Sequence, residues 1–287
     1  MHDLPPKKIW FITGASRGFG RTWAEAALKR GDRVAVTARN VADVADFKER
    51  YGDAALPLAL DVTDSQQVEH AVTEAHAAFG RLDVVLNNAG YSLVGAVEEL
   101  RIADVHAQFE TNVIGTLRVI QAALPFLRKQ RSGHLIGVSS GVGVVAFPLI
   151  GAYCATKWAF EGLHESLAQE VETFGIKVTL LEPGAYATEF GSPSSLRMTP
   201  ALDAYAALRE QVFERLSTME RGDPKATAEA ILQIVDTDNP PLRFFVGNTG
   251  LPMARAAYDA RLATWEHWQH LSNAAQGVVS PTGEDRT

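Results

Sequence analysis

Short apolar runs alternate with longer amphipathic stretches from residue 9 to residue 246. Seven runs predict β-strands. The first five or six are rich in leucine or β-branched residues without polar alternation, which is typical of parallel strands buried on both faces. The predicted strands are residues 9–13, 33–38, 55–60, 84–87, 134–138, 177–181 and 242–246.

Between these strands lie segments whose apolar residues recur at helical spacing. The predicted helices are residues 18–30, 41–51, 65–79, 102–129, 152–174 and 225–236. The first helix ends in Lys29-Arg30-Gly31, a basic last turn followed by a glycine. Each connection is long enough for a right-handed crossover. The alternation predicts an α/β fold, a Rossmann-type doubly wound parallel sheet of about seven strands with helices on both faces.

No linker or internal repeat divides the chain, so residues 1–287 are predicted to form a single domain. Residues 190–224 break the alternation with Gly191-Ser192-Pro193-Ser194-Ser195, which indicates a mobile loop, and with a helix at about residues 200–221. Long insertions in compact domains tend to be functional. We therefore favour a substrate-binding lid over an ordinary surface excursion.

The sequence predicts one more helix at about residues 253–271 and a polar, flexible tail at residues 273–287. Tyr258, Leu262, Trp265 and Trp268 follow one another at three-to-four spacing on that helix. We expect this stripe to pack on the core rather than to contact a membrane.

Composition narrows the possible functions. The 287 residues are 46% hydrophobic, carry a net charge of −7 and include one cysteine, Cys154. No basic patch predicts a nucleic-acid partner, and one cysteine excludes an intramolecular disulfide and a cysteine-based zinc cluster. The N-terminus has no apolar signal-peptide core, and no apolar stretch is long and unbroken enough to span a membrane. We expect a cytoplasmic protein without membrane contact.

Three glycines lie in the turn between the first strand and the first helix, in Thr13-Gly14-Ala15-Ser16-Arg17-Gly18-Phe19-Gly20. Glycine lets the backbone turn tightly and approach a pyrophosphate, whose charge then meets the helix N-terminus. The position of the triplet after the first strand favours a nucleotide site over a purely structural turn.

The end of the second strand indicates which dinucleotide binds. NAD sites usually offer a carboxylate there, whereas this chain has Ala38 followed by Arg39. Arg39, joined by Arg17 from the glycine turn, suits the 2′-phosphate of NADP because a guanidinium pairs bidentately with phosphate. We expect NADP(H) rather than NAD(H); the alternative for Arg39 is a solvated strand end.

Further candidates follow the third and fourth strands, because ligands bind outside the carboxyl ends of strands in such sheets. The carboxylate of Asp61-Val62 either accepts the adenine amino group or lies in the cap region of the next helix. Asn88-Ala89-Gly90 follows the fourth strand. Asn112 falls inside the predicted helix 102–129, where an asparagine indicates a local kink or a function.

Tyr153 and Lys157 form the candidate acid/base pair. They lie four residues apart in a predicted helix and therefore share one face. The lysine charge should lower the tyrosine pKa from about 10 toward working pH. A phenol tuned in this way can exchange a proton with a carbonyl or alcohol oxygen. Ser139 and Ser140 precede the pair.

Taken together, these residues resemble the short-chain dehydrogenase/reductases, in their compact single-domain branch. The resemblance covers about residues 9–246. It rests on T-G-x-x-x-G-x-G at 13–20, N-N-A-G at 87–90, Asn112, the serine before the tyrosine, Y-x-x-x-K at 153–157, and Pro183-Gly184 followed by Thr188. It implies that Ser140 hydrogen-bonds the substrate oxygen, with Ser139 structural.

The resemblance also assigns the proton route. It implies that Tyr153 transfers the proton, that Lys157 binds the nicotinamide ribose and lowers the Tyr153 pKa, and that Asn112 holds a water. Thr188 would bind the nicotinamide carboxamide. The predicted cofactor-binding residues are Gly14, Ser16, Arg17, Gly18, Phe19, Gly20, Arg39, Asp61, Val62, Asn88, Ala89, Gly90, Tyr153, Lys157, Pro183, Gly184 and Thr188. The predicted substrate-binding residues are Ser140, Val142, Tyr153, Tyr186 and Phe190.

The implied activity is NADP(H)-dependent hydride transfer that interconverts a carbonyl compound (a ketone or an aldehyde) and the corresponding alcohol. Apolar candidate walls favour a hydrophobic substrate. One alternative is a redox sensor that binds NADP(H) without turnover, which the complete Ser140, Tyr153 and Lys157 set opposes. Another is a nucleotide-sugar epimerase or dehydratase, which needs more than the roughly 100 residues after Pro183.

No metal site is predicted, since His267 and His270 lack a third ligand. The expected partner is a small-molecule substrate. The resemblance also implies a homodimer or homotetramer through the helices 102–129 and 152–174.

Overall fold

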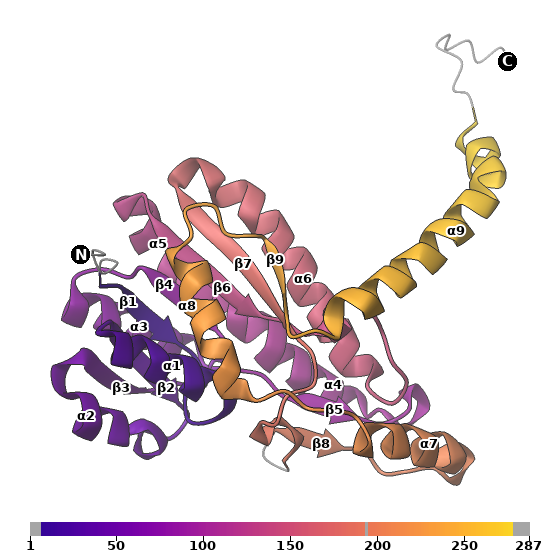
Figure 1. Cartoon of the computed structure of the whole chain (residues 1–287), viewed down its shortest axis with the longest axis horizontal. Helices are drawn as coiled ribbons and strands as arrows, with labels where there is room; N and C mark the ends of the chain where they lie inside the picture. Colours follow the sequence, from indigo (N-terminus) through magenta and orange to yellow (C-terminus); the bar gives the residue numbers. More distant parts are fainter. Residues whose placement is uncertain (1–6, 193–194, 278–287) are drawn as a thin grey trace, which may run out of the picture.

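The computed structural model describes residues 7–192 and 195–277. Its centre is a seven-stranded sheet in the order β3-β2-β1-β4-β6-β7-β9, with every pair of neighbours parallel (Figure 1). The strands are β1 (Ile9–Ile12), β2 (Arg33–Ala38), β3 (Ala55–Ala59), β4 (Val84–Asn87), β6 (Gly133–Val138), β7 (Ile176–Pro183) and β9 (Arg243–Val246). The predicted doubly wound sheet is confirmed.

Helices cover both faces of the sheet. On one face pack α1 (Gly18–Arg30) and α8 (Ala228–Asp236), and on the other α3 (Ser65–Phe79), α5 (Gly115–Gln130) and α6 (Gly151–Val171). Trp10 and Ile12 of β1 belong to the first apolar cluster, and Phe11 belongs to the second. Both faces of the central strands are therefore buried, which explains their continuous apolar sequence.

The predicted helix 102–129 is interrupted. It consists of α4 (Ile102–Phe109), a π-helical turn at Glu110–Ile114, and α5. Asn112 lies inside that turn, so the helix is irregular at the position where its asparagine indicated a kink or a function. The predicted helix 41–51 is likewise a 3₁₀ turn, Val41–Val44, followed by α2 (Asp46–Tyr51).

A second, two-stranded sheet was not predicted from the sequence. Its strands β5 (Ser92–Val94) and β8 (Leu196–Met198) pair in parallel beside α7 (Ala206–Ser217) (Figure 1). The backbone N–H of Thr199 donates to the Val94 carbonyl at 2.9 Å. The segment expected as a lid is thus joined to the body by main-chain hydrogen bonds. Of the loop expected at 191–195, residues 193–194 lie outside the described residues.

The last helix, α9 (Gly250–Gln276), extends past its predicted end and leaves the body of the molecule (Figure 1). Its expected core contact is wrong, because Tyr258, Leu262, Trp265 and Trp268 are 44–60% exposed. Helical spacing identifies an apolar face but not what covers it. Residues 273–276 of the expected tail are helical, and 278–287 lie outside the described residues. Within the described chain, none of the helices combines the length and apolarity that a membrane crossing requires.

Candidate active site

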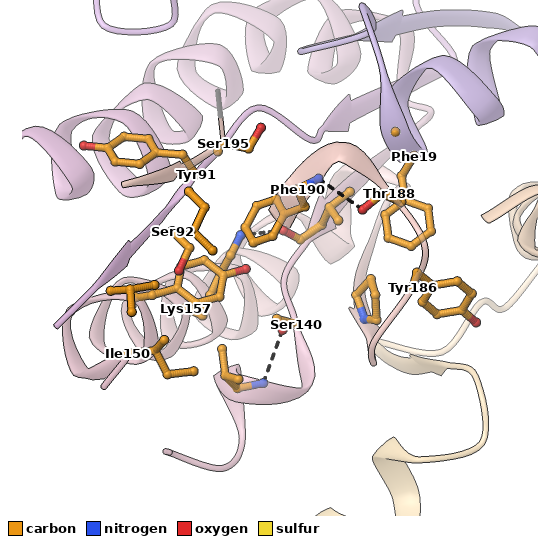
Figure 2. Close-up of a pocket in the computed structure, with 18 of the residues that line it drawn as sticks. Phe19, Tyr91, Ser92, Ser140, Ile150, Lys157, Tyr186, Thr188, Phe190 and Ser195 are labelled. Carbon is orange, nitrogen blue, oxygen red and sulfur yellow. Dashed lines mark hydrogen bonds between the residues drawn. The ribbon is translucent and has the colours of Figure 1, made fainter. Parts of the chain in front are cut away.

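A cavity of about 1150 Å³ lies where β1, β4, β6 and β7 end. The strand order reverses between β1 and β4, and such a reversal opens a crevice at the carboxyl ends of the strands. Within the described residues, every predicted site residue lines this cavity except Gly20 and Asn112. Figure 2 shows residues from the glycine turn, the segment after β6, α6 and the segment after β7 around the same space.

The glycine turn is held in shape by its own contacts. Gly14 and Gly18 have φ of +67° and +56°, which disfavour any side chain. A Cβ on Gly20 would lie 2.5 Å from the Gly14 carbonyl oxygen, so this glycine serves backbone packing. The Asn88 amide donates to the carbonyls of Thr13 and Gly14 at 3.1 and 2.9 Å, and it therefore ties the end of β4 to the turn.

The cavity wall at the end of β2 consists of Ala38 and Arg39, as the sequence indicated. Arg17 also lines the cavity, and its Nη2 donates to Ser195 Oγ at 2.9 Å, which links the glycine turn to the segment before β8. The tight glycine turn, the N-terminus of α1 and the two arginines fit the phosphates of a nicotinamide dinucleotide.

The structure separates the two alternatives for Asp61. The cap of α3 is Asp64, whose Oδ1 accepts from the backbone N–H groups of Gln66 and Gln67 at 2.9 and 3.1 Å. Asp61 lines the cavity instead, and its Oδ1 accepts from the backbone and hydroxyl of Thr63. Its role toward adenine stays a prediction.

Ser140, Tyr153 and Lys157 meet on one side of the cavity. Tyr153 and Lys157 project from α6 and are 7% and 5% exposed. Lys157 Nζ donates to the Val138 carbonyl at 2.8 Å and lies 5.8 Å from the centre of the Tyr153 ring. The Ser140 hydroxyl lies beside the Tyr153 phenol and favours its ionised form. Of the two adjacent serines, it is thus Ser140 that contacts the tyrosine.

The electrostatics of this group differ from the expectation. Burial raises the pKa of Tyr153 well above its ordinary value of 10, and the Ser140 hydroxyl opposes this only in part. Burial also lowers the pKa of Lys157 to about 8, against the attraction of Glu161. The expected lowering of the tyrosine pKa is therefore wrong for this arrangement. The ammonium bonds to Val138, and loss of water around the phenolate dominates.

Asn112 is almost fully buried and its amide is engaged. Its Nδ2 donates to the Tyr91 carbonyl at 2.9 Å and to Thr156 Oγ1 at 3.1 Å, and its Oδ1 accepts from the Tyr91 N–H at 3.0 Å. These bonds fix the segment after β4 against α6. The water-holding role implied for Asn112 stays a prediction.

A buried charge cluster lies next along α6. Glu161 and Glu182 are 4% and 1% exposed, and both contact the guanidinium of Arg243. Burial raises the pKa of both carboxyls, that of Glu182 to about 7. The three residues come from α6, β7 and β9 and form no sequence motif, so no local pattern could have predicted this cluster.

The opposite wall of the cavity is apolar. Phe190 lies 5.6 Å from the Tyr153 ring, centre to centre. The sequence analysis did not anticipate Tyr91 or Met253 of α9 in this wall. The rest of the wall comes from the segment expected to form the substrate-binding lid, namely Leu196, Met198, Val212, Phe213, Leu216 and Met219. Val142 lines the cavity beside them. Tyr186 also lines it, but its ring packs edge-on against Phe19 at 5.1 Å and points away from Ser140 and Lys157 (Figure 2). Its substrate role stays a prediction.

Comparison with known proteins decides the family. Residues 8–198 match the short chain dehydrogenase family. The chain belongs to this family. The oxidoreductase BOA17 of Botryotinia fuckeliana is 43% identical to this short-chain dehydrogenase over 93% of this chain and 99% of that protein. The 3-ketodihydrosphingosine reductase of Bacteroides thetaiotaomicron is 37% identical over 84% and 88%.

Solved structures of similar fold agree with this family assignment. A short-chain dehydrogenase from Streptomyces avermitilis superposes with a TM-score of 0.86 at 37% identity, covering 93% of this chain and 98% of that one. The structure of ElxO, 26% identical, holds NADP, and that of an alcohol dehydrogenase from Thermococcus sibiricus, 28% identical, holds 5-hydroxy-NADP. A nicotinamide cofactor is therefore supported for this short-chain dehydrogenase.

Proposed function

We propose that this short-chain dehydrogenase interconverts a ketone or aldehyde and the corresponding alcohol with NADP(H), on a hydrophobic substrate. The observation that carries the proposal is the meeting of Ser140, Tyr153 and Lys157 beside one cavity that also contains the glycine turn and Arg39. The preference for NADP(H) rests on Ala38 and Arg39 at the end of β2.

When bound, the nicotinamide supplies or accepts the hydride. In reduction, the Ser140 hydroxyl holds the substrate oxygen, and Tyr153 donates a proton to that oxygen as negative charge develops there. Its raised pKa keeps the phenol protonated and ready to donate. Lys157 places a positive charge beside the ring as the phenol loses its proton, and it would hold the nicotinamide ribose.

The apolar wall indicates the kind of substrate. Phe190, Phe213, Leu216 and Met219 line the cavity yet remain 38–43% exposed, so an apolar ligand would remove them from water. The related reductase of B. thetaiotaomicron is named for a keto compound, which agrees with a carbonyl substrate. We assign residues 190–224 as the substrate-binding lid. The cytoplasmic location stays a prediction.

The proposal is tested by NADPH oxidation over a panel of hydrophobic ketones, aldehydes and quinones, with the stereochemistry of each product determined. We expect turnover with at least one class of carbonyl. Tyr153→Phe should bind NADPH nearly as well as wild type while turnover falls by orders of magnitude. Tyr51→Phe, on the remote helix α2, is the matched control.

Two outcomes would contradict the proposal. NADPH binding without turnover across the whole panel would favour the sensor alternative. Full activity in Tyr153→Phe would show that the proton comes from another group.

A further inference from the structure

The far part of α9 presents bulky apolar side chains to solvent. Residues 262–277 are all exposed, and Leu262, Trp265 and Trp268 are 48%, 60% and 52% exposed. Near its base the helix is anchored by Arg261, whose Nη1 donates to the Val144 carbonyl at 3.1 Å. The same guanidinium lies 4.9 Å from the Trp158 ring and 5.0 Å from the Tyr258 ring.

These side chains form one continuous stripe. Leu251, Tyr258 and Trp265 are seven residues apart, as are Ala254, Arg261 and Trp268. With Leu262, they occupy an arc of roughly 120° on the helix. Ala254 and Arg261 contact the body of the molecule. Trp268 lies on the same side of the helix as these two residues, but past the end of the body. Ala263 and His267 lie on the opposite face.

We propose that α9 pairs with α9 of a second copy of this chain, antiparallel, about a two-fold axis at Ala263. Gly250 and Gln276 are equidistant from Ala263, so the far half of each helix would lie beside the exposed Leu251 and Tyr258 in the first half of the other. In this register Tyr258 faces Trp268 of the second copy, an aromatic pair formed twice by symmetry.

The charges of α9 favour a second copy over a lipid surface. Arg255 and Arg261 are balanced by Asp259 and Glu266, and the chain carries a net charge of −7. Helices that lie on membranes are typically rich in lysine and arginine, which bind anionic lipids. α9 has no such excess of positive charge, and the acidic chain would be repelled by an anionic surface.

The size of the stripe suits a specific contact. The stripe has five half-exposed side chains, Leu251, Tyr258, Leu262, Trp265 and Trp268, which offer on the order of 100 Å² each. Two copies would then bury about 1,000 Å², the smallest area expected of a specific interface. The inference does not depend on the proposed activity.

The test is the molar mass of the full chain in solution, measured by light scattering after size-exclusion chromatography. We expect wild type to be a dimer or a multiple of it, and the double variant Trp265→Glu/Trp268→Glu to have half that mass with an unchanged circular dichroism spectrum. Ala263→Glu, on the opposite face, should keep the wild-type mass. A monomeric wild type, or a double variant of unchanged mass, would overturn the proposal.

A second experiment tests the register. Leu262→Cys should be joined to its copy by a short bismaleimide cross-linker, and Ala263→Cys should not. Cys154 gives little background because it is buried. Equal cross-linking of the two variants would contradict pairing through this face of α9. Wild type that pellets with phosphatidylserine vesicles while the double variant stays in solution would identify α9 as a membrane-binding helix instead.

Discussion

At the scale of single residues, Lys157 is a basic side chain in a position where burial opposes its charged form. Its ammonium is buried, which lowers its pKa to about 8, yet it keeps a hydrogen bond to Val138. Tyr153 lies one turn earlier on α6, and burial raises its pKa where it lowers that of Lys157. Both side chains have their neutral forms favoured by burial, and both must carry charge to function in the proposed reaction.

Replacing Lys157 should therefore change how stability depends on pH. The lysine pKa falls on folding from 10.5 to about 8, so between these values the unfolded chain holds a proton that the folded chain has released. This group makes wild type more stable as pH rises through that window. The Lys157→Met variant has no titrating group at this position, so its stability lacks this increase with pH.

Relative to wild type, Lys157→Met should lose about 3 kcal/mol of stability between about pH 8 and pH 10.5. Urea unfolding at both ends of this range measures the difference, and Lys225→Met, at an exposed lysine, is the control. A difference that does not vary with pH would show that burial does not shift this lysine.

Arg39 should determine the cofactor preference. We expect wild type to use NADPH far better than NADH. Arg39→Asp should reverse the order by removing a charge-assisted bond to the 2′-phosphate and offering a carboxylate to the ribose. One such bond corresponds to about 10–100-fold in kcat/KM. Steady-state kinetics with both cofactors measures this, with Arg81→Asp as control. Equal efficiencies in wild type would remove the basis of the NADP assignment.

At the scale of elements, the site depends on close backbone contacts between the glycine turn and the end of β4. Gly20 lies against the Gly14 carbonyl and the Asn88 amide, and no larger residue fits there. Gly162 of α6 is a helical glycine of the opposite kind, because a Cβ built on it meets nothing within 4 Å.

These two glycines should respond oppositely to alanine. Gly20→Ala forces the turn apart and should reduce stability by about 1–3 kcal/mol, along with NADPH affinity. Gly162→Ala removes a flexible residue from a helix interior and should add about 0.5–1 kcal/mol. Thermal unfolding and NADPH titration of both variants check this. A Gly20→Ala enzyme with normal NADPH affinity would mean that the turn does not bind the phosphates.

Arg243 joins α6, β7 and β9. Arg243→Met would leave Glu161 and Glu182 buried without a cation, at a cost of about 3 kcal/mol. Since the Glu182 pKa is already raised to about 7 from 4.5, the folded chain binds a proton that the unfolded chain releases between these values. The contribution of Glu182 to the stability of the folded chain therefore falls as pH rises through that window.

The defect of Arg243→Met should accordingly be larger at about pH 8 than at about pH 5, which urea unfolding can measure. Lys48→Met, which breaks the exposed contact with Asp53, should change stability by less than about 1 kcal/mol. Equal effects of the two variants would mean that the buried carboxyls do not need Arg243.

At the scale of the whole molecule, the sheet and the cofactor side could be predicted because their signals are local. Each strand of the central sheet is a short apolar run, and Gly14, Asn88 and Tyr153 lie in compact motifs at strand ends or on one helix. The pairing of β5 with β8 had no such signal, since each strand has three residues and they lie about 100 positions apart. The exposure of α9 depends on what surrounds the folded chain, which a helical period does not encode.

The cofactor cavity lies across the whole sheet, so filling it should stabilise the entire domain. NADPH at about 100 times its Kd should add about 2.7 kcal/mol by mass action, or roughly 5–10 °C in Tm. Tyr153→Phe should keep this shift, and NADH at the same concentration should give a smaller one. Differential scanning fluorimetry measures all three. An equal shift with NADH would contradict the preference for NADP(H).

The β5–β8 pairing has an evolutionary consequence. Main-chain hydrogen bonds hold β8 to the body, and such bonds do not depend on which side chains the strand carries. Mutations can therefore exchange Leu196 or Met198 while the segment stays docked. Descendants of such a chain can drift toward new substrates at this wall while Tyr153 and Lys157 on α6 keep the same chemistry.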